Sequence, residues 1–247
     1  MMARSVCATT TMMLLLMLII GCYYLGSIHP ATLTDDAERL FVCASNSTCG
    51  AACQLYSSQH RQNYSHGWAV RHHSLGQHYN RFNCKVAIEI GIARAELSKY
   101  LLDNVGSIRE YYALDPFLGG YDNTDAMSEI LLQHNASDIW SQSILNNLRE
   151  FGCRFRLFHG FSADAAKFIN NASVDCIFID GDHTYGGVKL DINIFFSKLA
   201  INGYMIFDDY SWQFPGVIKA VDELVDMHKI PLMKINKHNN YYFQKTK

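Results

Sequence analysis

From residue 85 onward, short apolar runs alternate with stretches of helical length, and this alternation constrains the fold more than any other feature of the chain. Apolar strands separated by helices are typical of a parallel sheet that helices cover on both faces. We therefore expect an α/β fold with a doubly wound, mostly parallel, seven-stranded sheet that ends in an antiparallel hairpin. The expected strands are 86–90, 110–114, 154–159, 174–179, 204–207, 232–235 and 241–244, and the expected helices are 95–104, 125–135, 139–151, 163–169, 186–199 and 215–227.

The N-terminal segment is uncharged from residue 5 to residue 28 and continuously apolar from 12 to 20. A run of this length can span a bilayer as a signal anchor. The alternatives are a cleaved signal peptide and a buried core helix. Because Arg4 precedes the run, the N-terminus should stay cytosolic. We expect a single-pass membrane protein of the secretory pathway whose main domain is lumenal, or else a secreted protein.

Three segments follow from these patterns. Residues 1–31 are the signal anchor or signal peptide with a short cytosolic end, 32–84 are a cysteine- and histidine-containing stem or cap, helical or irregular, and 85–247 are the α/β domain. The formal net charge of −2 gives no bias toward nucleic acid, so we expect no nucleic-acid partner. The sequence does not reveal an oligomeric state.

Glycosylation sequons and cysteines fit a lumenal location. Sequons of the N-x-[ST] type occur at Asn46, Asn63, Asn135 and Asn171. In an oxidising lumen, four cysteines could form two disulfides in any of three pairings, with a zinc site as the alternative; they are Cys43, Cys49, Cys53 and Cys84. Cys153 and Cys176 lie in strand-like runs and are expected to be ordinary buried cysteines.

Ligands of open α/β sheets bind outside the carboxyl ends of the strands, so the residues after each strand are the candidate site. Gly91 permits a tight turn after the first strand. Ala93 and Ala95 stand where a dinucleotide fingerprint would carry glycines, which disfavours a nicotinamide-dependent oxidoreductase. Asp115 ends the second strand, at a spacing that suits two ribose hydroxyls.

The sharpest feature is the group of acidic and imidazole side chains after the fourth and fifth strands. Asp180, Asp182 and His183 follow one strand, and Asp208 and Asp209 follow the next. Capping of the following helix could explain one of these aspartates. Carboxylates crowded together repel one another, and a hard cation such as Mg²⁺, which prefers oxygen ligands, would relieve that cost.

Residues 174–188 together with 203–210 resemble the class I S-adenosylmethionine-dependent methyltransferases, and among them the methyltransferase-24 group and the macrocin-type sugar O-methyltransferases. The resemblance covers residues 85–244. It implies S-adenosylmethionine as the cofactor and a Rossmann-like methyltransferase fold. The implied cofactor-binding residues are Glu89 and Gly91 for the methionine part, Asp115 for the ribose, Phe161 and Ser162 for the adenine, and also Ala93 and Asp180.

The same resemblance implies Mg²⁺ ligands at Asp180, Asp208 and Asp209 and a general base at Asp182. His183 is the second candidate for the base, or a residue that orients Asp182, and its presence leaves the metal dependence open. The expected activity is Mg²⁺-assisted O-methylation of a hydroxyl on a glycan or small molecule in the secretory lumen. The alternatives are a metal-independent methyltransferase of the same fold and a non-catalytic, membrane-tethered binding module.

Overall fold

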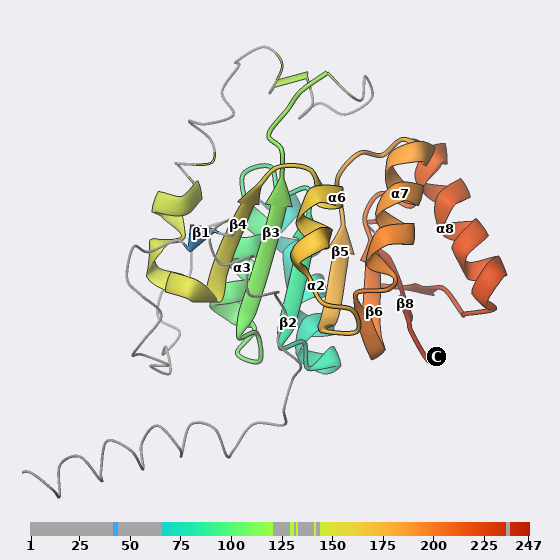
Figure 1. Ribbon diagram of the computed structural model, residues 1–247, viewed down its shortest axis with the longest axis horizontal. Coiled ribbons are helices and arrows are strands. Elements are labelled where there is room, and N and C mark those ends of the chain that lie inside the picture. The colour runs from blue at the N-terminus through green and yellow to red at the C-terminus, as the bar shows by residue number, and fades with distance from the viewer. Residues whose placement is uncertain are drawn as a thin grey trace, which may run out of the picture. The chain divides into compact units, whose positions relative to one another are not determined.

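The computed structural model describes residues 42–43, 66–120, 144–235 and 238–247, together with 129, 130, 132 and 141. Its centre is an eight-stranded sheet in the order β1-β4-β3-β2-β5-β6-β8-β7 (Figure 1). The strands are β1 (Val42–Cys43), β2 (Val86–Ile90), β3 (Glu110–Asp115), β4 (Phe155–His159), β5 (Val174–Ile179), β6 (Leu199–Phe207), β7 (Met233–Lys234) and β8 (Tyr241–Gln244).

The five strands from β2 to β6 pair in parallel, whereas β1, β7 and β8 pair in antiparallel fashion. The strand order reverses between β2 and β5, since β3 and β4 lie on one side of β2 and the later strands on the other. The predicted doubly wound, mostly parallel sheet with a terminal antiparallel hairpin is confirmed. The short β1 adds an eighth, edge strand that the sequence did not predict.

Helices cover both faces of the sheet. Figure 1 shows α6 and α7 in front of the sheet and α2 and α3 behind it. The helical segments are α2 (His66–Phe82), α3 (Glu96–Asn104), η2 (Arg149–Arg154), α6 (Ser162–Ala165), η3 (Ala166–Phe168), α7 (Tyr185–Phe195) and α8 (Pro215–His228). Strands β2 to β6 and β8 contribute to two cores: Ile88 packs with residues of α7 and α8, and its neighbour Ala87 packs with residues of α2 and α3.

Helix α2 lies within the segment expected to be a stem or cap, and it packs into the core of the sheet. Leu75 and Tyr79, four residues apart and thus on one face of the helix, are fully buried. Phe82 stacks on Tyr204 of β6 with ring centroids 3.7 Å apart. The C-terminal end of α2 is therefore fixed against the middle of the sheet.

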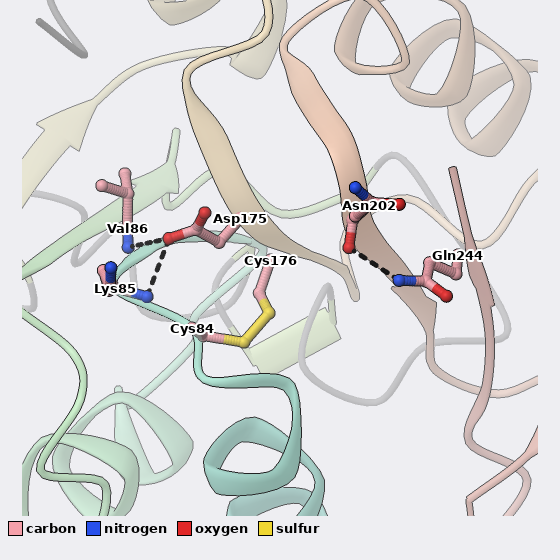
Figure 2. The surroundings of a disulfide bond; sticks show 7 residues. All are labelled: Cys84, Lys85, Val86, Asp175, Cys176, Asn202 and Gln244. Carbon is pink, nitrogen blue, oxygen red and sulfur yellow. Dashed lines mark hydrogen bonds between the residues drawn. A yellow bond between two sulfur atoms is a disulfide. The ribbon is translucent and has the colours of Figure 1, made fainter. Parts of the chain in front are cut away.

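A disulfide joins Cys84, which follows α2, to Cys176 of β5 across 92 residues of sequence (Figure 2). Beside it, a carboxylate oxygen of Asp175 accepts hydrogen bonds from the backbone N–H groups of Lys85 at 2.8 Å and Val86 at 2.9 Å. Cys153 is disulfide-bonded as well. The expectation that Cys153 and Cys176 are ordinary buried cysteines is wrong, because the crossover that places β2 beside β5 brings Cys84 and Cys176 together.

Several expectations lie outside the described residues. They are the N-terminal hydrophobic helix, most of the helix expected at 125–135, and the sequons at Asn46, Asn63 and Asn135. Of the helix expected at 139–151, residues 144–147 are helical, and residues 149–151 belong to the 3-10 segment η2. Asn171 is exposed, and its side-chain oxygen accepts a hydrogen bond from Lys198 at 3.0 Å. Within the part of the chain that is described, no helix is long and apolar enough to cross a membrane.

Candidate functional site

The turn after β2 is built on backbone conformations that favour glycine. Gly91 has a φ of +80°, and a Cβ there would lie 2.1 Å from the backbone oxygen of Asp180. Ala93 and Ala95 also have positive φ, at 47° and 57°. The turn thus adopts a glycine-type conformation in which two of the positions carry alanine, and this is why its sequence signal is weak.

Asp115, at the end of β3, holds this turn. One oxygen of its carboxylate accepts hydrogen bonds from the N–H groups of Ile92 at 2.8 Å and Ala93 at 3.0 Å, and the other accepts one from Phe117 at 2.7 Å. Burial raises the pKa of Asp115, although the backbone hydrogen bonds oppose the rise. A carboxylate has about four lone-pair positions, so one remains for a ribose hydroxyl. The expected contact with the ribose stays a prediction.

Glu89 is buried one residue before the end of β2. Its carboxylate accepts hydrogen bonds from Ser98 at 2.5 Å and Tyr111 at 2.6 Å. Burial raises the pKa of Glu89 to about 8, despite these two bonds. At neutral pH the side chain is therefore mostly a neutral acid that ties α3 and β3 to β2.

The two residues that were expected to lie beside the adenine, Phe161 and Ser162, follow β4. Phe161 is 58% exposed, so its aromatic ring is accessible at the surface for stacking with a ligand. The Ser162 hydroxyl donates to Asp191 of α7 at 2.5 Å. Burial raises the pKa of Asp191 to about 6. Asp191 was not predicted from the sequence. The only indication of it there is that an acidic residue lies on the apolar, buried face of α7.

The acidic ends of β5 and β6 meet an arginine from α2. Arg71 Nη2 lies 2.7 Å from Asp180 Oδ2 and also donates to Asp208 Oδ2. Asp208 Oδ1 accepts a hydrogen bond from the buried Asn240 at 2.5 Å. The structure thus brings together Asp180 and Asp208 as expected, and it adds Arg71 and Asn240.

These contacts decide the charges of the cluster. Burial alone would lower the pKa of Arg71, but Asp180 and Asp208 outweigh it and raise the pKa. Burial alone would raise the pKa of Asp180, whereas Arg71 lowers it. Burial and the neighbouring Asp180 carboxylate raise the pKa of Asp208 well above its ordinary value.

His183 lies between the two acidic loops. Its Nε2 is 3.5 Å from a carboxylate oxygen of Asp180 and 3.7 Å from one of Asp209. Its ring also contacts the ring of Phe214, with the ring centroids 4.6 Å apart. Burial would lower the pKa of His183, but Asp180 and Asp209 outweigh it and raise the pKa to about 9. At neutral pH this imidazole is therefore mostly protonated, and it serves as a cation between carboxylates.

Asp182 precedes helix α7 and is separate from the Arg71 contacts. One of its carboxylate oxygens accepts the N–H of Thr184 at 2.8 Å, and Thr184 itself caps α7 by accepting the N–H of Gly187 at 3.2 Å. A Cβ at Gly187 would lie 2.4 Å from the Asp182 carboxylate, so this glycine leaves room for it. The helix cap is thus Thr184, and capping does not account for the remaining carboxylates.

The cluster does not fit the expected Mg²⁺ site. Among the described residues, no three side chains of His, Cys, Asp or Glu are arranged to hold a metal ion. Two of the three expected ligands, Asp180 and Asp208, each accept a hydrogen bond from Arg71, and the second oxygen of Asp208 accepts one from Asn240. Arg71 had a signal that the sequence analysis did not use: it is spaced four and eight residues from the buried Leu75 and Tyr79, on the same face of α2.

The sheet order, the glycine-type turn after β2 and the acidic ends of β5 and β6 define a Rossmann-like fold of the methyltransferase class. A family model described as a methyltransferase domain matches residues 88–210. Residues 88–210 are therefore a methyltransferase domain of the methyltransferase-24 group, similar to the class I S-adenosylmethionine-dependent methyltransferases.

Solved structures share this fold at low sequence identity. Calicheamicin methyltransferase CalS11 has a TM-score of 0.57 at 13% identity, covering 73% of this chain and 80% of its own. The O-methyltransferase NovP has a TM-score of 0.52 at 19% identity, covering 72% and 79%. The S-adenosylhomocysteine-bound methyltransferase PaMTH1 of Podospora anserina has a TM-score of 0.50 at 12% identity, covering 72% and 78%.

One curated protein also matches over a short stretch. An uncharacterized protein of Acanthamoeba polyphaga mimivirus is 42% identical over 55 residues, which are 21% of this chain. The match spans about a quarter (24%) of the length of that protein.

Replacing Gly91 with alanine should distort the turn after β2, where the cofactor is expected to bind. The added Cβ would meet the Asp180 backbone at 2.1 Å in a left-handed conformation, and the conformation alone costs about 1–2 kcal/mol. We expect a lower free energy of unfolding and at least roughly tenfold weaker S-adenosylmethionine binding by calorimetry. Gly106→Ala is the control, because a Cβ at Gly106 meets no atom within 4 Å. Equal cofactor affinity of the Gly91→Ala and Gly106→Ala variants would contradict the assignment of this turn.

Proposed function

We propose that this chain transfers the methyl group of S-adenosylmethionine to a hydroxyl group of a small molecule or glycan. The observation that carries the proposal is the contact between the glycine turn and the acidic loop. The N–H of Asp180 donates to the backbone oxygen of Ile90 at 2.8 Å, and a Cβ at Gly91 would clash with Asp180. A cofactor held by the turn is therefore next to the carboxylates that can act on an acceptor.

The reaction needs a base and an aligned acceptor. The acceptor oxygen forms a bond to the methyl carbon while the carbon–sulfur bond breaks and its electron pair stays on sulfur, which yields S-adenosylhomocysteine. A hydroxyl has a high pKa, so a side chain must take its proton as it attacks. We assign this role to Asp182, whose carboxylate is not engaged by Arg71. The pKa of His183 is raised to about 9 by Asp180 and Asp209 acting against burial, so its imidazole is mostly protonated at neutral pH and is the weaker candidate for the base.

Similar proteins support oxygen as the acceptor atom. NovP is named an O-methyltransferase, and CalS11 is named a TDP-rhamnose 3′-O-methyltransferase. A sugar hydroxyl is consistent with the acidic loops, since carboxylates accept hydrogen bonds from neighbouring hydroxyls. The Mg²⁺ ion expected from the sequence has no part in this proposal, because Arg71 and Asn240 engage both oxygens of Asp208 and one oxygen of Asp180, two of the three expected ligands.

We also propose that the domain works in the lumen of the secretory pathway, attached to the membrane through its N-terminal segment or released from it. Disulfides such as Cys84–Cys176 persist in oxidising compartments and are rare in the cytosol. The uncharged run at residues 5–28 and the exposed asparagine of the sequon at Asn171 favour the same location.

The effect of an Asp115→Ala substitution on cofactor binding tests the proposal. Asp115→Ala should weaken S-adenosylmethionine binding roughly 10- to 100-fold, because it removes the ribose acceptor and three hydrogen bonds that hold the turn. Calorimetry measures the affinity, and transfer of a labelled methyl group to a panel of sugars and catechols measures the activity. Asp226→Ala, at an exposed position of α8, is the control. If the wild-type protein binds no S-adenosylmethionine, the proposed function is wrong.

A further inference from the structure

Arg71 reaches the acidic cluster from outside the strands that form it. It comes from α2, whose side chains Leu75 and Tyr79 are buried behind the sheet. Its side chain is 11% exposed, and its guanidinium lies 5.8 Å from the ring centre of Phe178. The side chain is therefore held within the protein and directed at Asp180 and Asp208.

A guanidinium in this place reduces the repulsion between the two carboxylates, as a bound cation would. Two carboxylates that converge at adjacent strand ends repel each other unless a positive charge lies between them. Arginine stays charged at every relevant pH, and its planar group offers several N–H donors to carboxylates. A second cation at the same oxygens would be repelled by the first.

We propose that Arg71 takes the place of a divalent metal ion, so that this methyltransferase site carries its cation as part of the polypeptide. Arg71 is a positioning residue in this arrangement: it holds Asp180 and Asp208 at the strand ends and offsets their charge, and Asp180 lies two residues before Asp182 in the loop after β5. An acceptor oxygen that loses its proton beside this cluster then meets less negative charge. This role in turnover rests on the proposed function, whereas the exclusion of a metal ion from the cluster can be tested without it.

The test measures binding of Mn²⁺ by electron paramagnetic resonance, since Mn²⁺ occupies Mg²⁺ sites and its free form is directly quantified. We expect no binding to the wild-type protein at millimolar Mn²⁺. Arg71→Ala should bind Mn²⁺ roughly 100-fold more tightly, because a buried positive charge has been removed from beside two carboxylates. Asp208→Asn added to Arg71→Ala should abolish that binding. Arg81→Ala, an exposed arginine of the same helix, should behave as the wild type.

Turnover gives a second readout. The wild-type protein should be equally active with EDTA and with Mg²⁺, and Arg71→Lys, which keeps the positive charge, should retain more turnover than Arg71→Ala. If Arg71→Ala does not fold, the Mn²⁺ titration of the wild-type protein and its activity with EDTA and with Mg²⁺ decide alone. Mn²⁺ binding to the wild type that Asp208→Asn removes would overturn the proposal, and so would an Arg71→Ala protein that folds but binds no Mn²⁺. Neither result would bear on whether the chain binds S-adenosylmethionine.

Discussion

Replacing Asp182 with asparagine should lower turnover roughly 100- to 10,000-fold, the usual contribution of a general base. Asparagine keeps an oxygen that can accept the N–H of Thr184, so the start of α7 should remain intact. We therefore expect the affinity for S-adenosylmethionine and the midpoint of thermal unfolding to change little. Single-turnover methyl transfer measures the loss, and Asp226→Asn on the exposed side of α8 is the matched control.

The pH dependence separates Asp182 from His183. The pKa of His183 is raised to about 9, chiefly by Asp180 and Asp209 working against burial. If His183 were the base, turnover would increase with pH up to about 9 as the imidazole loses its proton. If Asp182 is the base, turnover should lack this increase. A wild-type profile that rises tenfold per pH unit from 7 to 9, with Asp182→Asn fully active, would assign the proton to His183 instead.

The second large effect concerns stability. The double variant Cys84→Ala with Cys176→Ala should lower the free energy of unfolding by about 4 kcal/mol. The disulfide closes a loop of 92 residues, and restraint of the unfolded chain grows with the length of the closed loop. Urea unfolding of the oxidised proteins measures the difference.

The double variant is a more specific test than a reducing agent, because reduction would also break the disulfide of Cys153. Alanine suits both positions, since both side chains are fully buried and a polar replacement would add a desolvation cost. A change smaller than about 1 kcal/mol would show that the crosslink restrains the unfolded chain far less than its loop length predicts.

The sheet could be predicted because its strands are locally encoded. The strands at 86–90, 174–179 and 241–244 begin and end where the sequence analysis placed them. Strand β6 begins at Leu199 rather than at residue 204, because Leu199 pairs with Val174 ahead of an irregularity in the register. The helix expected at 163–169 is shorter and continues as a 3-10 turn. Such boundaries depend on tertiary pairing.

The acidic side of the site could be predicted for the same reason, since Asp180 and Asp208 directly follow apolar strands. Its positive side could not. Arg71 lies 109 residues from Asp180 in the sequence, and Asn240 lies 32 residues from Asp208. The partners of Cys84 and Cys176 are likewise set by which strands become neighbours. Periodicity and motif spacing describe local segments, so they identify the carboxylates and leave their partners open.

The position of α2 has a consequence for tracing this site through evolution. The family match begins at residue 88, so a comparison restricted to it includes the carboxylates and omits the helix that neutralises them. A protein trimmed to residues 85–247 would likewise keep strands β2 to β8 but lose Arg71 and half of a disulfide. In a relative, the residue that faces these carboxylates from the preceding helix should indicate where the positive charge resides. A basic residue at that position would show that the polypeptide itself supplies the positive charge. With a small neutral residue there, a cation from solution would have to supply it.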